Sequence, residues 1–220
     1  MKVCVQGLWH LGSVTSGCFA SVGHEVVGLD FDGDLIREFQ AGKPPIFEPG
    51  LEEMIGSGLA SGKLKFISSV DNLPHDFEVL WVAYDTPVDE DDVANVDFVV
   101  SQVEAVLPFL PNETTVLLSS QMPVGSIRRL EAIADKLCPE KRLSFACSPE
   151  NLRLGKAMDV FLKPDRVVVG VRSERDKERI GRLLQPITDR IEWMCVDVCG
   201  IGGNDQTCYK CIFGYFCCLC

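Results

Sequence analysis

The opening segment of the chain, residues 1–30, decides the fold and reads MKVCVQGLWHLGSVTSGCFASVGHEVVGLD. Residues 1–5 are apolar and β-branched, a pattern that predicts a buried strand. A glycine-bounded turn leads into a segment of small residues, 13–22, which predicts a helix, and a second apolar strand, 25–29, ends on Asp30. This order is typical of dinucleotide binding, because the helix start binds a pyrophosphate and the acidic residue binds ribose hydroxyls.

The turn itself departs from the usual G-x-G-x-x-G pattern. We call it the glycine turn; its residues, all expected to contact the cofactor, are Gly7, Leu8, Trp9, His10, Leu11 and Gly12. Trp9 occupies the position of the middle glycine, which normally lets phosphates approach the backbone closely. A turn of this kind also connects many a strand and helix without binding anything. The flanking elements, with Asp30 about twenty residues further on, favour nucleotide binding.

Composition restricts the class of protein. The chain has 220 residues, 46% of them hydrophobic, which is ordinary for a globular protein with a real core. A net charge of −11 argues against a general nucleic-acid or anionic-membrane surface. No signal peptide precedes the first strand and no apolar run reaches membrane-spanning length, so we expect a cytoplasmic protein.

The rest of the chain alternates strands and helices. Further strands are predicted at 63–67, 77–84, 114–118, 143–146 and 166–171, and further helices at 34–40, 51–59, 97–107, 125–137 and 174–184. We therefore predict an α/β fold, a doubly wound, mostly parallel sheet of the Rossmann-like type with helices on both faces.

Polar residues follow four of the predicted strands, where ligand sites of such sheets form. In one interpretation these residues only end the strands. In the other, the four groups lie at one edge of the sheet and line a single crevice. The four groups are the glycine turn, Asp85-Thr86-Pro87, Ser120-Gln121-Met122-Pro123 and Ser148-Pro149-Glu150.

Six motifs in order resemble the N-terminal NAD-binding domain of the UDP-glucose/GDP-mannose dehydrogenase family, over about residues 1–194. They are the opening unit with Gly23, His24 and Asp30, then PIFEPGL at 45–51, Thr86-Pro87, SQMPVG at 120–125, SPENLR at 148–153 and PDR at 164–166. A short-chain 3-hydroxyacid dehydrogenase shares the opening unit, but it would not explain residues 148–153.

The resemblance implies an NAD-dependent enzyme that oxidises the C6 alcohol of a nucleotide sugar, UDP-glucose or similar, to a carboxylate in two hydride transfers. In it the glycine turn would hold the pyrophosphate and Asp30 the adenosine ribose, where a carboxylate disfavours the 2′-phosphate of NADP. The cofactor groove would be lined by Asp85, Thr86, Pro87 and Ser120. Glu150 would act in acid–base catalysis, and Asn151, Leu152, Arg153 and Leu154 would lie along the substrate.

Three further positions depart from the family pattern. Leu35 stands where a basic residue often holds the adenosine side. Gln121 replaces a threonine that binds water near the reacting carbon, and we expect its amide to do the same. Leu154 replaces a second glutamate, which leaves Glu150 as the candidate carboxylate of that segment. We expect no metal among these catalytic groups.

The cysteines indicate a break in the chain after Met194. Seven of the eleven fall in the last 26 residues. We therefore divide the chain into an NAD-binding domain, 1–194, and an aberrant tail, 195–220. Cys208 and Cys211 have zinc-knuckle spacing but lack histidine partners, and a disulfide framework is unusual in a cytosolic chain. The family's central helix and nucleophilic cysteine segment are not recognisable in this tail.

A shift of reading frame explains the tail better. Back-translating residues 203–216 and moving the frame by one base permits EMTKHAINAFLATS, which resembles the family's central helix. We therefore expect a frame slip between residues 193 and 199, and little or no dehydrogenase activity from this chain. The full-length parent is expected to be a homodimer. Two alternatives stay open: a noncatalytic NAD-binding remnant, and a cysteine-rich metal-binding or interaction protein on a Rossmann scaffold.

Overall fold

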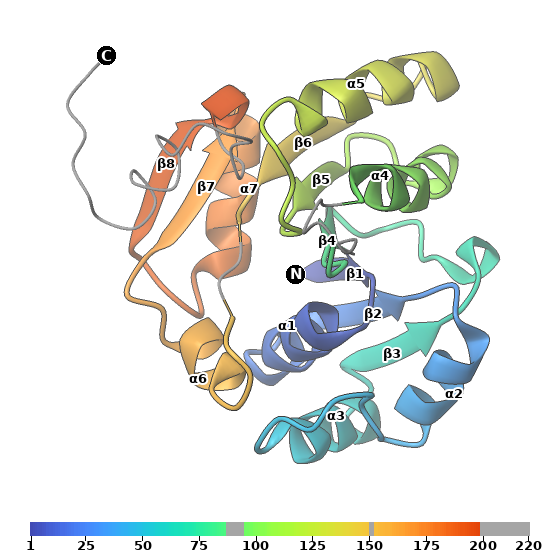
Figure 1. Ribbon diagram of the computed structural model, residues 1–220, viewed down its shortest axis with the longest axis vertical. Coiled ribbons are helices and arrows are strands. Elements are labelled where there is room, and N and C mark those ends of the chain that lie inside the picture. Colours follow the sequence, from blue (N-terminus) through green and yellow to red (C-terminus); the bar gives the residue numbers. More distant parts are fainter. Residues whose placement is uncertain (87–94, 150–151, 199–220) are drawn as a thin grey trace.

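A computed structural model describes residues 1–86, 95–149 and 152–198 (Figure 1). Its strands form a single sheet in the order β3-β2-β1-β4-β5-β6-β7-β8. They are β1 (Lys2–Gln6), β2 (Glu25–Leu29), β3 (Leu64–Ile67), β4 (Val79–Val82), β5 (Thr115–Leu118), β6 (Ser144–Cys147), β7 (Val167–Val171) and β8 (Ile191–Cys195). The helices are α1 (His10–Ser21), α2 (Gly33–Gln40), α3 (Leu51–Ala60), α4 (Val96–Glu104), α5 (Ser126–Leu137), α6 (Ala157–Leu162) and α7 (Glu174–Leu184). Three 3₁₀ turns lie at Val70–Asn72, Leu107–Phe109 and Val196–Val198.

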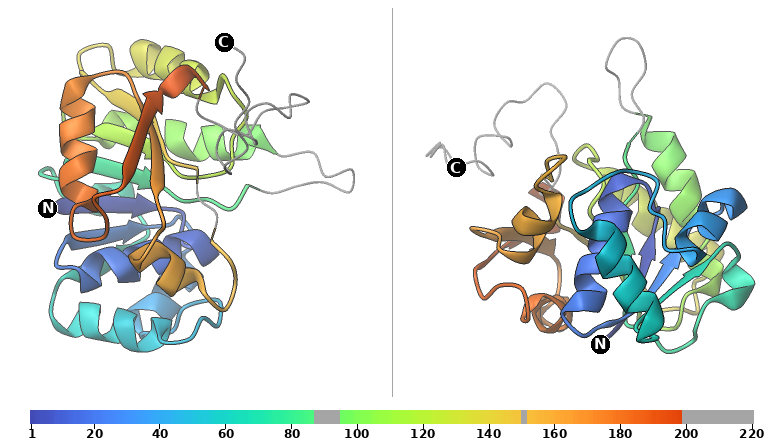
Figure 2. Two further views of the ribbon diagram at one scale, coloured as in Figure 1. Left: turned by 90° about the vertical axis from the view of Figure 1, so that its left-hand side faces the viewer. Right: turned by 90° about the horizontal axis from the view of Figure 1, so that it is seen from below.

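The central strands are buried on both faces, as predicted. In β4, Trp81 packs into the core cluster that includes residues of α1, α3, α6 and α7, whereas its neighbours Leu80 and Val82 pack into a second cluster with α4 and α5. Alternate residues of one strand thus pack against opposite helix layers. Figure 2 shows helices on both faces of the sheet. The predicted Rossmann-like α/β fold is confirmed.

The layer that holds α1 is joined to the sheet by aromatic contacts. Phe19 of α1 meets Trp81 of β4 edge to face at 5.1 Å and Phe161 of α6 at 5.3 Å, measured between ring centroids. Aromatic pairs in this geometry stabilise the folded protein by more than the burial of their apolar surface alone. They fix α6 against the same helix that follows the glycine turn.

Two elements were not predicted. The α6 helix has six residues, too few to show a helical period, and β8 is an edge strand whose apolar residues are only half-buried. The predicted helix 13–22 begins earlier, at His10, with Trp9 at its N-cap position. The remaining elements match the predicted ranges to within a few residues, except that the predicted strand 77–84 is shortened to β4.

The sheet reverses direction at β7. Cys147 of β6 pairs antiparallel with Gly170, and the Ser148 hydroxyl donates to Val168 O at 3.0 Å. Strand β8 then runs parallel to β7. The connection from β6 to β7 therefore starts and ends at the same edge of the sheet, and it contains the segment expected to contact the substrate.

Ordered structure continues past Met194, where the predicted tail begins. Strand β8 runs to Cys195, and the following Val196 is 1% exposed. Asp197 is held by Arg128 of α5 at 2.9 Å and by Arg172, which follows β7, at 2.7 Å. Residues 199–220 lie outside the described residues, so the aberrant tail stays a prediction. None of the helices in the described part of the chain has the length and apolar character that crossing a bilayer requires.

Candidate cofactor and substrate site

The four strand ends singled out in the sequence come from neighbouring strands. Strands β1, β4, β5 and β6 are adjacent and parallel, so their carboxyl ends share one edge of the sheet, which we call the carboxyl edge. Backbone hydrogen bonds continue this order past the strands. Ala83 N–H donates to Gln6 O at 2.7 Å, and Ser148 N–H donates to Leu118 O at 2.9 Å.

The glycine turn is built so tightly that two positions accept only glycine. Gly7 has a φ of +84°, and a Cβ on it would lie 2.7 Å from the ring of Tyr84. A Cβ on Gly12 would lie 1.7 Å from the carbonyl oxygen of Gly7. The first turn of α1 therefore lies directly against the strand end, because neither glycine carries a side chain that would hold the two backbones apart.

Trp9, the departure from the family pattern, does not fill this turn. Its side chain is 53% exposed, and the residue forms the N-cap of α1. The neighbouring Leu8 and Leu11 are buried in the core, so they offer a ligand only their backbone. The indole therefore lies at the surface and is not packed into the core.

Asp30 lies at the end of β2 and holds the turn. Its Oδ2 accepts the backbone N–H of Leu8 at 2.8 Å, and its Oδ1 accepts the N–H of Asp32 at 3.1 Å. A carboxylate has about four acceptor positions, so two backbone donors leave it able to accept ribose hydroxyls as well.

Asp85, three residues beyond the end of β4, faces the start of α1. Desolvation raises the pKa of its carboxyl above the ordinary 3.8, against the opposing effects of the His10 ring and of the backbone N–H groups of Leu11 and His10. The residue as a whole is exposed, whereas its carboxyl group is partly desolvated beside the start of α1. A side-chain anion thus stands beside the helix N–H groups that a pyrophosphate would use.

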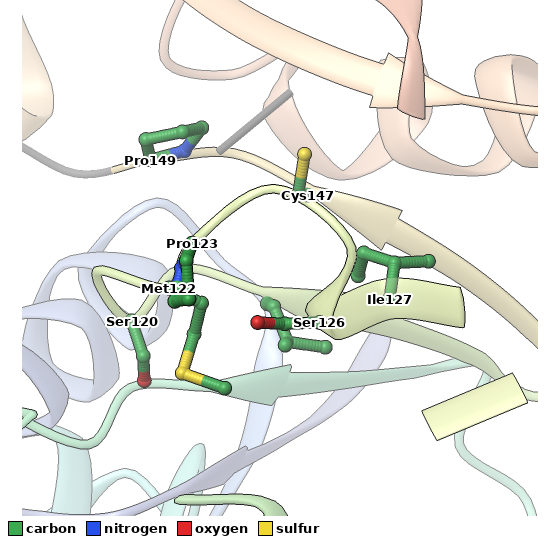
Figure 3. Close-up of a pocket in the computed structure, with 8 residues that line it drawn as sticks. Ser120, Met122, Pro123, Ser126, Ile127, Cys147 and Pro149 are labelled. Atoms are coloured by element: carbon green, nitrogen blue, oxygen red, sulfur yellow. The ribbon is translucent and has the colours of Figure 1, made fainter. Parts of the chain in front are cut away.

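The β5 and β6 ends form a small pocket (Figure 3). Ser120 is 4% exposed, and its hydroxyl has no hydrogen-bond partner within residues 1–86, 95–149 and 152–198. Thr86 Oγ1 donates to the backbone oxygen of Gln121 at 2.9 Å, while the Gln121 side chain is exposed. The lining residues are Leu118, Ser120, Met122, Pro123, Ser126, Ile127, Cys147 and Pro149.

The segment expected to contact the substrate is described in part. Leu152 packs half-buried against the core, whereas Arg153 and Leu154 are exposed, Leu154 at 67%. Three further predicted site residues lie outside the described residues: Pro87, Glu150 and Asn151.

Glu48 is a site residue that the sequence analysis missed. Its side chain is 1% exposed and lies 3.5 Å from His10, measured from Oε2 to Nε2. The carboxylate also accepts the backbone N–H groups of Gly155 and Ala157, each at 2.8 Å. The sequence offered one signal for this residue, a glutamate enclosed in a proline-rich loop.

Together the parallel βαβ unit, the glycine turn and the terminal aspartate define a dinucleotide-binding domain of the Rossmann class. The chain belongs to the UDP-glucose/GDP-mannose dehydrogenase family: residues 1–188 match its NAD binding domain. NAD is accordingly its cofactor. The close-packed glycines at the start of α1 and the Asp30 carboxylate at the end of β2 fit this group.

Characterised relatives support the same assignment. The chain is 33% identical over 190 residues to the UDP-glucose 6-dehydrogenase of Pseudomonas aeruginosa, covering 84% of this chain and 42% of that protein. The Rhizobium meliloti UDP-glucose 6-dehydrogenase is also 33% identical, over 85% of this chain and 44% of its own length. The present chain thus spans less than half the length of these relatives.

Solved structures agree. A UDP-glucose dehydrogenase from Pyrobaculum islandicum superposes with a TM-score of 0.83 at 30% identity, covering 89% of this chain and 46% of that one. A GDP-mannose dehydrogenase from Pseudomonas aeruginosa gives a TM-score of 0.86 at 22% identity, over 97% of this chain and 49% of that one, and shows the shared fold.

Proposed function

We propose that this protein is the NAD-binding portion of a nucleotide-sugar dehydrogenase that oxidises the C6 alcohol of UDP-glucose, or a similar sugar, to a carboxylate with two NAD. One observation carries the proposal. The glycine turn, tied to Asp30 at the carboxyl edge, occurs in a chain 33% identical to a UDP-glucose 6-dehydrogenase.

We assign the cofactor contacts to the residues of that edge. The backbone of residues 7–12 accommodates the pyrophosphate, and Asp30 accepts hydrogen bonds from the adenosine ribose. Asp85, Thr86, Pro87 and Ser120 line the groove beyond it, where the unpartnered Ser120 hydroxyl is a donor for the ligand. Bound NAD supplies the hydride acceptor.

The substrate lies on the same edge in this proposal. Glu150 moves protons as the acid–base group, and the exposed amide of Gln121 orients water near the reacting carbon. Asn151, Leu152, Arg153 and Leu154 lie along the sugar. The β6 to β7 connection, which begins and ends at the carboxyl edge, supports this proposal.

We infer that the 220-residue chain has little or no activity on its own, because no nucleophilic cysteine segment of the family is recognisable in it. Its full-length parent is proposed to be a cytoplasmic homodimer. The frame-slip hypothesis is tested by the nucleotide sequence across codons 190–220. If no other reading frame of that sequence encodes the family's central helix, the hypothesis is wrong.

The proposed function is tested by calorimetric titration of the purified chain with NAD⁺ and with NADP⁺, followed by an NADH assay with UDP-glucose. We expect NAD⁺ to bind more tightly than NADP⁺, and no NADH to form. Absence of NAD⁺ binding contradicts the cofactor site, whereas NADH formation contradicts the inferred inactivity alone. Zinc bound stoichiometrically, without NAD⁺ binding, would favour the alternative of a metal-binding protein.

A further inference from the structure

The loop between α2 and α3 buries a charge and exposes the aromatic residue beside it. Glu48 is 4% exposed, whereas Phe47 is 86% exposed. Carboxylates are rarely buried without partners, and a large apolar side chain is more often the buried one. Pro49 fixes the backbone next to Glu48 and removes a donor. The orientation of this loop is therefore set by the contacts of the Glu48 carboxylate.

Those contacts join three segments that are distant in sequence. Glu48 Oε2 accepts the N–H of Gly155, Oε1 accepts the N–H of Ala157, and Nε2 of His10 lies 3.5 Å from Oε2. His10 is the first residue of α1, and Ala157 is the first residue of α6. A single buried carboxylate thus links the start of the cofactor helix to the turn that follows residues 152–154.

Further contacts hold the loop and α6 together around Glu48. Gly50 ends the loop with a φ of +83°, and the position of its absent Cβ is 3.6 Å from the Cε of Met158 in α6. At the other end of α6, Phe161 packs against Phe19 of α1. Helix α6 is therefore held by contacts at both ends. At its N-terminal end, next to residues 152–154, the polar contact is the hydrogen bond from Ala157 N–H to Glu48.

We propose that Glu48 is a positioning residue that sets the placement of residues 152–154 relative to the start of α1, and so couples NAD binding to the substrate segment. This inference rests on the proposed function, in which the glycine turn binds NAD and residues 152–154 lie along the sugar. Glu48 acts through His10 on one side and through Gly155 on the other.

The first experiment replaces the carboxylate by an amide, Glu48→Gln. The amide has a single acceptor oxygen, so one of the two backbone N–H groups loses its partner. We expect hydrogen exchange at Gly155 or Ala157 to accelerate about tenfold, with exchange at Val169 of β7 unchanged as evidence of an intact sheet. The matched control is Glu52→Gln, an exposed carboxylate in the first turn of α3, which should alter neither amide.

The second experiment measures coupling through His10. Glu48→Gln and His10→Phe should each weaken NAD⁺ binding about fivefold in calorimetric titration, and the double variant should be no weaker than the weaker single variant. Additive losses, or an unchanged NAD⁺ affinity in both single variants, overturn the inference while leaving the cofactor site intact. Should Glu48→Gln not fold, an unchanged NAD⁺ affinity in His10→Phe overturns it equally. Absence of NAD⁺ binding by the unmodified chain overturns the proposed function, and this coupling with it.

Discussion

The carboxylate of Asp30 holds the backbone N–H of Leu8 at 2.8 Å, across 22 residues of sequence. This hydrogen bond ties the end of β2 to the glycine turn, so the residue expected to recognise the ribose also shapes the loop expected to hold the phosphates. Loss of the charge therefore affects two parts of the cofactor site at once.

We predict that Asp30→Asn weakens NAD⁺ binding about tenfold, because hydrogen bonds to charged groups are stronger than those to neutral ones. The preference for NAD⁺ over NADP⁺ should shrink as well, since the repulsion of a 2′-phosphate is lost. Both dissociation constants are measured by calorimetric titration. Asp34→Asn, four residues on and exposed, is the control and should leave both constants unchanged. An unaltered cofactor preference in Asp30→Asn would contradict the ribose assignment.

Gly12→Ala is expected to destroy the glycine turn. Its Cβ would lie 1.7 Å from the Gly7 carbonyl oxygen, so the backbone must move. We expect the free energy of unfolding to fall by about 3 kcal/mol and NAD⁺ binding to be lost. Urea denaturation and titration measure the two effects. Gly56→Ala in α3 meets no atom within 4 Å and should instead stabilise the chain by about 0.5–1 kcal/mol. Wild-type NAD⁺ affinity in Gly12→Ala would refute the phosphate site.

Asp85 should oppose NAD⁺ at neutral pH, because its carboxylate faces the helix start that receives the phosphates. Asp85→Asn removes this repulsion and should tighten NAD⁺ binding about fivefold, as expected for like charges screened by water. The raised pKa of Asp85 means that acidification discharges it above pH 3.8, so the advantage of the variant should shrink as the pH falls.

The other titratable groups facing Asp85 set the control for that pH series. The His10 ring acts directly on the Asp85 carboxyl, and Glu48 lies behind that ring. Both remain in Asp85→Asn, so the difference between variant and wild type isolates Asp85. A difference that stays constant from pH 7 to about pH 4 would contradict the prediction.

His24 should make the stability of the domain depend on pH. Burial lowers the pKa of its imidazole below 6.5, although the hydrogen bond to Leu183 O at 2.8 Å opposes the shift. The unfolded chain therefore binds the proton more readily, so stability should fall as the pH drops below 6.5. Thermal unfolding at pH 8 and pH 5.5 measures the loss. His24→Gln should reduce it, whereas His75→Gln at an exposed position should not.

The periodic part of the fold could be predicted from the sequence because its signals are local. Strand β2 and helix α7 match their predicted ranges in full, since a run of apolar residues or a helical stripe is contained within the element. Helix α6 and strand β8 could not be predicted in this way. The first is too short to show a period, and the second is a half-buried edge strand with a weak pattern.

The residues of the candidate site differ in the same way: some could be predicted from local spacing, and others depend on contacts between distant segments. Gly7, Gly12 and Asp30 belong to one supersecondary unit, and their place was predicted from spacing. The role of Glu48 depends on Gly155 and Ala157, more than a hundred residues away, so no local pattern could indicate it. Asp85 was expected to line the groove, but its position opposite the N–H groups of α1 follows only from the pairing of β4 with β1.

The reversal of β7 has a consequence for how such domains can diversify. A crossover in a parallel sheet must return to the opposite edge before the next strand begins, which limits what its length can do. The connection between β6 and β7 carries no such obligation, since Cys147 and Gly170 pair antiparallel. Insertions at this connection would therefore lengthen the segment at the carboxyl edge without altering the pairing of the strands.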